Sequence, residues 1–264
     1  MIFTRPTTEA EARARRLAWR RGTVAVLAFL ALWQLAAMLE LAGRGGLPTP
    51  VETLAVFTAD YATDPDYWRS WLVSLQRVAA GFVIAQLLGI PLGLLIGLNR
   101  RAFDLVFPVF EILRPIPPLA WVPLAILFWP TTESSIVFIT TVGAFFIIVM
   151  NVLDGIRSIH PPHLFQARSL GARPAVILRR VVLPAILPSI VAGMVLGIAV
   201  TWNVLIAAEM IAADSGLGRL TWEGYVAATA PVVVIGMVSI GLAGIVSTAL
   251  IHALERRLLA WRTA

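Results

Sequence analysis

Six apolar segments, each long enough to cross a lipid bilayer, constrain this chain more than any other feature of its sequence. They occupy residues 23–42, 72–98, 105–129, 135–153, 189–212 and 232–254. A membrane-spanning helix needs about 20 such residues, because each adds about 1.5 Å and the hydrocarbon layer is about 30 Å thick. The sequence therefore predicts an all-α integral membrane protein with six transmembrane helices.

The composition agrees with this prediction. Hydrophobic residues make up 59% of the chain and charged residues 14%, which is more apolar than a soluble domain. The first apolar segment follows a basic stretch but is longer than the apolar core of a signal peptide. We therefore expect residues 1–22 to form a basic cytoplasmic segment and residues 23–264 to form the transmembrane domain.

The positions of the arginines predict the orientation. Most of them fall on the side of the membrane that would hold both termini, while Arg44, Arg69 and Arg219 fall on the other side. Cytoplasmic flanks of membrane spans carry an excess of positive charge. We expect both termini to be cytoplasmic, and the basic flanks to be topology signals, so no nucleic acid is expected as a partner.

A polar and basic insert, FQARSLGARPAVILRRVVLPAILP, lies at residues 165–188, inside a predicted cytoplasmic loop at about 154–188. Two prolines precede it, Gly171 suits the left-handed position that ends a helix, and Pro174 suits the start of the next. The pattern predicts a helix, a turn and a second helix. Physical reasoning alone leaves open an amphipathic pair that lies on the membrane surface.

The same insert resembles the EAA loop of ABC importer permeases, whose pattern is EAA-x3-G-x9-I-x-LP. Gln166, Ala167 and Arg168 stand in the EAA positions, and the later positions keep the spacing. In that family the loop is the coupling helix, which docks into a socket on the ATPase. The resemblance assigns ATPase coupling to His163, Gln166, Ala167, Arg168, Leu170, Gly171, Ala172, Val181, Leu183 and Pro184. Gln166 replaces the usual glutamate, which removes one carboxylate contact.

Further stretches, among them LPTPVETL, ILRPIPPLAWVPLAILFWP and AAEMIAADSGLGRL, resemble the permeases of nitrate, sulfonate and taurine importers. The resemblance covers most of the chain and implies a type I ABC importer permease in the bacterial inner (plasma) membrane. It also implies a homodimer with a second permease copy, two cytoplasmic ABC ATPase subunits and an extracytoplasmic substrate-binding protein. The implied cargo is a small anion such as a sulfonate, taurine or nitrate.

The third apolar segment contains several prolines, which remove helical hydrogen bonds within the bilayer. A broken backbone at that depth is tolerated only against protein or a water-filled cavity. Charged residues within spans cost at least about 2.5 kcal/mol each unless they are paired or hydrated. We therefore assign to the translocation path Glu111, Arg114, Pro117, Trp121, Trp202, Asn203 and Glu209. The alternative is a buried Glu111–Arg114 ion pair that serves packing alone.

Glycines recur every four residues in two spans, at Gly89, Gly93 and Gly97 and again at Gly193 and Gly197. Such spacing lets helix backbones approach closely. We expect these residues to pack helices together rather than to contact a ligand.

Catalytic and metal-binding signals are missing from the sequence. It contains no cysteine and no lysine, so the lysine-containing phosphate loop of ATPases is absent. We expect no enzyme activity and no cofactor on this chain, with ATP and Mg on the partner ATPase. His160 and His163 lack further ligands, so no metal site is expected. The alternative function is an ion-gradient-driven secondary transporter or channel, although only one span is strongly interrupted by proline; an intramembrane enzyme would lack a recognisable catalytic motif.

Overall fold

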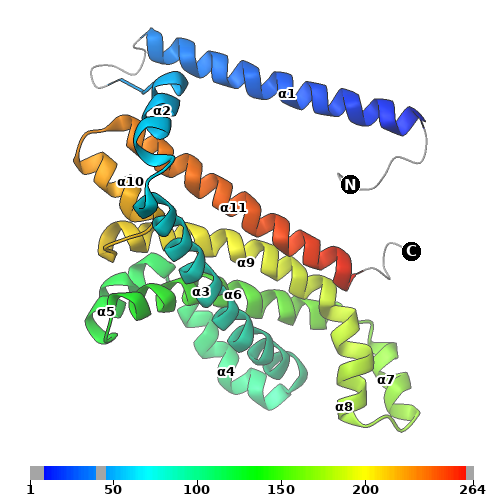
Figure 1. Ribbon diagram of the computed structural model, residues 1–264. Helices are drawn as coiled ribbons and strands as arrows, with labels where there is room; N and C mark the ends of the chain where they lie inside the picture. The colour runs from blue at the N-terminus through cyan, green and yellow to red at the C-terminus, as the bar shows by residue number, and fades with distance from the viewer. Residues whose placement is uncertain (1–8, 40–45, 260–264) are drawn as a thin grey trace. The chain divides into compact units, whose positions relative to one another are not determined.

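A computed structural model describes residues 9–39 and 46–259, and this part of the chain is built from helices without strands (Figure 1). The helices in chain order are α1 (Glu9–Met38), α2 (Pro50–Val56), η1 (Phe57–Tyr61), α3 (Pro65–Leu98), α4 (Arg100–Leu113), η2 (Pro118–Trp121), α5 (Val122–Phe128), α6 (Thr132–Arg157), α7 (Pro161–Ser169), α8 (Pro174–Ile177), η3 (Leu178–Val182), α9 (Leu183–Ala212), α10 (Leu217–Val226) and α11 (Ala230–Leu258).

The chain divides into two compact units. The smaller unit comprises Met1–Asp64 and Gly224–Ile235 and contains α1, α2 and η1. In it, the Trp33 indole nitrogen donates to the Pro48 carbonyl at 3.0 Å, and the Thr49 hydroxyl accepts from the Glu52 amide at 3.0 Å. The second hydrogen bond caps the first turn of α2 and explains why that helix begins at Pro50.

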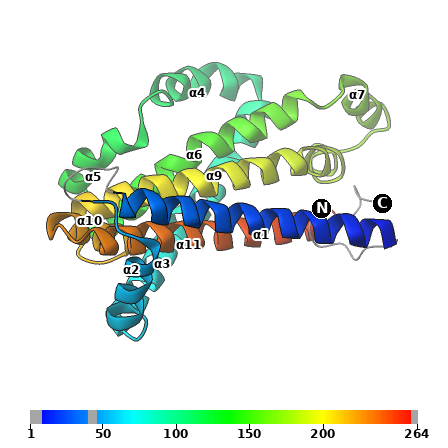
Figure 2. The same cartoon turned by 90° about the horizontal axis from the view of Figure 1, so that it is seen from above.

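The larger unit, Pro65–Glu223 with Gly236–Ala264, is organised around α6. This helix packs along both α3 and α9 (Figures 1 and 2). The largest side chains buried at these contacts are aliphatic, among them Ile136, Ile139, Ile148, Ile186 and Leu205. The three helices form the frame on which the polar groups described below are placed.

Glycines let α3 and α6 approach closely. A Cβ atom added to Gly89 would lie 2.9 Å from Ile148 Cγ2, and one added to Gly93 would lie 2.7 Å from Val152 Cβ. Gly97 is likewise against Ile156. Each step of four residues on α3 matches a step of four on α6, so the packing role predicted for these glycines is confirmed.

Within residues 9–39 and 46–259, five helices are long and apolar enough to cross a membrane: Arg16–Met38, Pro65–Leu98, Thr132–Arg157, Pro174–Ala212 and Ala230–Leu258. The third predicted span, residues 105–129, is not one helix. It consists of Arg100–Leu113 and Pro118–Phe128, which meet at 88°. Thus the break predicted from the prolines is confirmed, and it is large enough to make this segment either a broken span or a re-entrant loop.

Other boundaries differ from the sequence prediction as well, and the first and second spans begin at Arg16 and Pro65 rather than at residues 23 and 72. The fifth span begins at Pro174 rather than at residue 189, because α8, η3 and α9 run on without interruption. The first span is described as far as Met38, and the predicted residues 40–42 lie outside the described part of the chain, as do residues 1–8 of the basic segment.

Candidate translocation pocket and coupling loop

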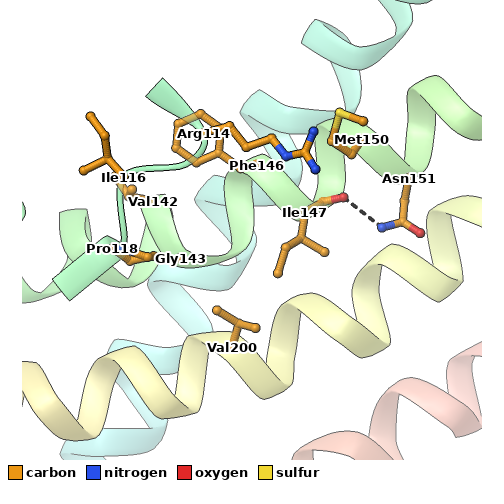
Figure 3. Close-up of a pocket in the computed structure, with 10 residues that line it drawn as sticks. All are labelled: Arg114, Ile116, Pro118, Val142, Gly143, Phe146, Ile147, Met150, Asn151 and Val200. Carbon is orange, nitrogen blue, oxygen red and sulfur yellow. Dashed lines mark hydrogen bonds between the residues drawn. The ribbon is translucent and has the colours of Figure 1, made fainter. Parts of the chain in front are cut away.

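A pocket of about 340 Å³ lies between the break in the third segment and the helices α6 and α9 (Figure 3). Most of its lining is apolar, and two side chains supply its long polar groups, Arg114 and Asn151. The complete lining is Arg114, Ile116, Pro118, Val142, Gly143, Phe146, Ile147, Met150, Asn151 and Val200. A cavity of this kind, with few polar groups on apolar walls, suits a small ligand with both charged and apolar parts.

The sequence of the break explains how Arg114 reaches this pocket. Helix α4 ends at Leu113 because Pro115, Pro117 and Pro118 cannot donate the next backbone hydrogen bonds. The chain restarts at Pro118 as a short 3₁₀ turn and continues as α5. Arg114 therefore stands at the corner, where its side chain extends toward Met150 (Figure 3).

Arg114 and Glu111 form the ion pair expected from their spacing, with 3.1 Å between Nη1 and Oε1. Both side chains are about half exposed in the single chain, 45% for Arg114 and 51% for Glu111. In the single chain the pair is therefore only partly buried. A half-exposed guanidinium keeps donors that can meet an anion.

Asn151 was not predicted from the sequence as a site residue. Its amide nitrogen donates to the Ile147 carbonyl at 2.9 Å (Figure 3). Across from it, a Cβ atom on Gly193 would lie 2.8 Å from Asn151 Cβ, so α9 can approach only because residue 193 is glycine. Its amide is thus fixed by α6 and α9 at the wall of the pocket. An asparagine within an otherwise apolar span was the available sequence signal.

The other residues predicted to line the translocation path lie outside this pocket. Pro117 is exposed before η2, and Trp121 is half-buried, with an indole N–H that has no partner among the described residues. Trp202 is buried and donates to the Ser247 hydroxyl at 3.2 Å, while Asn203 is exposed and donates to the Ala199 carbonyl. Of the seven residues assigned to the path, Arg114 alone lines this pocket.

Glu209 lies in a separate buried network. Its side chain is fully buried, and it accepts hydrogen bonds from Ser74 Oγ at 2.8 Å, Arg77 Nη1 at 2.8 Å and the Gly218 amide at 2.9 Å. Arg77 also donates to both carboxylate oxygens of Glu133. The structure therefore does not bring Glu209 to the pocket, and its polar atoms are used within the protein.

The loop after α9 is folded around this network. Arg77 Nη1 donates to the Ser215 carbonyl at 2.6 Å, and the Leu217 amide donates to Ser74 Oγ at 2.9 Å. Gly216 has a φ of +121° and faces the Glu209 carboxylate so closely that no side chain would fit. Residues 213–218, ADSGLG, thus form a loop whose backbone surrounds the buried carboxylate of Glu209. The sequence did not predict this role.

The predicted coupling segment has the expected helix-turn-helix form. Helix α7 covers Pro161–Ser169, and Gly171 has the left-handed φ of +73°. The Gly171 amide donates to the Arg168 carbonyl at 2.9 Å, and the Ala172 amide donates to the Ala167 carbonyl at 3.1 Å. These two bonds form a Schellman motif, which explains why glycine stands at this position of the EAA pattern.

The second half of the segment is a widened helix. Residues Leu178–Val182 form a π-helical turn between α8 and α9. Pro184 lies two residues after this turn, and a proline ring conflicts with the carbonyl four residues earlier, here that of Arg180. The wider π-helical turn relieves the conflict between the Pro184 ring and the Arg180 carbonyl. This explains why Leu183 and Pro184 follow the turn.

Burial separates the residues of the coupling segment, including Leu164 and Phe165 beside the predicted ones, into two groups. Leu164, Ala167 and Ala172 pack against the hydrophobic core. Leu170 is 87% exposed and Phe165 is 66% exposed. His163, Gln166, Arg168 and Gly171 are exposed as well, while Val181 and Leu183 pack on the core side and Pro184 is exposed. Phe165 and Leu170 thus remain as two exposed apolar side chains of the coupling segment.

Comparison with known proteins identifies the class of this fold. Residues 89–260 match the family model described as "Binding-protein-dependent transport system inner membrane component". The taurine transport system permease protein TauC of Escherichia coli is 33% identical over 94% of each chain. The nitrate import permease protein NrtB of Synechocystis is 31% identical over 89% of this chain and 87% of NrtB.

A solved structure shares the fold. The chain superposes on a structure titled as an inward facing conformation of the MetNI methionine ABC transporter, in its native crystal form, with a TM-score of 0.60 and 21% identity. The match covers 72% of this chain and 98% of the other. The protein belongs to the binding-protein-dependent inner membrane components, and within them to the ABC importer permease family that includes TauC and NrtB.

Proposed function

We propose that two copies of this permease form the path for a small anion, and that each copy is coupled to a separate ATPase through α7. The observation that carries the anion path is Arg114, which stands at a sharp break in a membrane segment and lines a pocket between helices. Broken backbone within the bilayer is tolerated where it faces protein or a hydrated cavity. A guanidinium in that setting attracts an anion.

The composition of the pocket supports an oxyanion as cargo. Arg114 offers several donors in a planar fork, and Asn151 adds an amide held against α6. Val142, Phe146 and Met150 provide apolar walls. Sulfonates, taurine and nitrate all carry an anionic group that this fork can bind, and the names of TauC and NrtB point to such cargo.

Coupling through α7 is supported by its exposed tip. Leu170 and Phe165 project from a helix whose opposite side is anchored on the core through Ala167 and Leu164. A rigid helix with an exposed apolar tip can transmit the movement of a partner to the spans that follow it. The ATP and Mg would be bound by that partner, because the chain lacks lysine and with it the phosphate-binding loop.

Purification from native membranes tests the proposal. The tagged permease, extracted in mild detergent, should elute with an ATP-hydrolysing subunit and with an untagged second copy of itself. Elution as a single polypeptide that transports the anion along an ion gradient would favour the secondary-transporter alternative.

A further inference from the structure

We propose that this protein has a binding site for the phosphodiester headgroup of an anionic phospholipid, formed by Arg100 and Arg157 over the ring of Phe103. The site is a pocket of about 400 Å³ where α3 ends, α4 begins and α6 ends. It is distinct from the pocket that contains Arg114, and the two share no lining residue.

Two guanidinium groups from different helices meet at one aromatic ring. The central carbon of Arg100 lies 6.0 Å from the centre of the Phe103 ring, and that of Arg157 lies 5.9 Å from the same centre. Arg157 is also 5.9 Å from the centre of the Phe107 ring. The two guanidinium groups thus approach one aromatic ring from two helices, and their like charges favour an anion beside both of them.

The aromatic base is rigid. Phe103 stacks on Phe107 with 4.6 Å between ring centres, and Phe107 stacks on the buried Phe110. Leu153 of α6 is buried in the same cluster. The rings therefore fix the position of the pocket floor relative to α6.

Acidic neighbours neutralise the two arginines only weakly. Arg100 pairs with Asp104 at 3.2 Å, and Arg157 pairs with Asp154 at 3.7 Å. Each pair lies within a single helix, the first in α4 and the second in α6, and all four side chains are more than half exposed. Exposed pairs of this kind contribute at most about 1 kcal/mol, so a phosphate that bridges the two guanidiniums can compete with them.

The surroundings favour a lipid over a free anion. Ile96, Leu98 and Leu153 line the pocket beside the arginines, at the ends of helices that are candidate membrane spans. Leu98 is 45% exposed at the end of α3, where an acyl chain can contact it. Basic pockets between spans are known sites for anionic headgroups.

The test is lipid selectivity of the purified full chain. The detergent-solubilised protein is mixed with equal amounts of phosphatidylglycerol and phosphatidylcholine, and native mass spectrometry gives the bound ratio. Replacing both residues, Arg100→Gln with Arg157→Gln, should lower the preference for phosphatidylglycerol by about fivefold per arginine, from about 1 kcal/mol for each basic side chain at an anionic surface. The matching Lys pair should keep part of the preference, because it keeps the charge without the planar fork.

Arg101→Gln is the matched control, since Arg101 is exposed in the same turn but does not line the pocket. An unchanged preference in the double Gln variant would overturn the proposal, and so would an equal loss in Arg101→Gln, which would indicate diffuse attraction. Displacement of the lipid by millimolar inorganic phosphate would reassign the site to a free anion. Loss of the eluting ATPase without a change in lipid ratio would reassign it to a protein interface.

Discussion

Arg77 on α3 and Glu209 on α9 form a buried ion pair, with 2.8 Å between Nη1 and Oε1, although 132 residues separate them in the chain. Arg77 is 3% exposed and Glu209 is fully buried. The second carboxylate of the network, Glu133, comes from the first turn of α6. One arginine therefore joins α3 to the first turn of α6 and the last turn of α9.

Removing this arginine should destabilise the protein strongly. Arg77→Met leaves Glu209 buried without its cation, which typically costs about 3–5 kcal/mol. The expected result is a clear fall in the melting temperature of the detergent-solubilised protein. The control is Arg219→Met, which breaks an exposed pair with Glu223 and should cost less than about 1 kcal/mol. Equal effects of the two substitutions would show that the buried network does not stabilise the fold.

The turn after α7 should tolerate asparagine but not valine. Gly171 has a φ of +73°, a conformation that costs an L-residue about 1–2 kcal/mol and that asparagine adopts more readily than valine. Gly171→Val should therefore leave membrane insertion intact and abolish ATP-driven uptake, while Gly171→Asn should keep much of it. Uptake and insertion are measured in the same cells. Wild-type uptake by the valine variant would contradict a coupling role for this turn.

Substitutions at Arg114 distinguish an anion site from a structural ion pair. Arg114→Met should lower uptake by about 30-fold or more, since a charged hydrogen bond contributes about 2 kcal/mol. Arg114→Lys should retain part of the activity, because it keeps the charge. The double variant Glu111→Gln with Arg114→Met should not recover transport. Recovery would mean that the loss came from the stranded carboxylate of Glu111 and would remove Arg114 from the path.

The orientation predicted from the arginines can be tested by labelling, because the chain has no cysteine of its own. Asp214 and Ser169 are both exposed, at opposite ends of the segment that runs from α7 to the loop after α9. In intact cells an impermeant thiol reagent should label Asp214→Cys and spare Ser169→Cys. The reverse labelling pattern would invert the topology.

The features that could be predicted from the sequence are those with a local cause. Gly171 ends α7 through hydrogen bonds to residues of the same helix. The prolines after Arg114 break their helix whatever other helices pack against it. Gly89 and Gly93 are four residues apart, and this spacing likewise predicts a helix-packing face even when the neighbouring helix is not known.

The features that could not be predicted depend on which helices meet. Glu133 and Glu209 lie 56 and 132 residues from Arg77, so no spacing rule joins them. A charge within a span marks either a path or a buried pair, and the packing of α3 against α6 and α9 decides between them at Glu209. Asn151 belongs to the pocket because Gly193 allows α9 to approach it, which is again a tertiary relationship.

The most direct test of the proposed function is uptake by reconstituted proteoliposomes. The permease is combined with its ATPase and substrate-binding protein, and accumulation of taurine, an alkanesulfonate and nitrate is measured in turn. We predict that at least one of these anions accumulates only when all three components and ATP are present, without an imposed ion gradient. Uptake by the permease alone under an ion gradient, unaffected by ATP, would contradict its assignment as the ATP-coupled path.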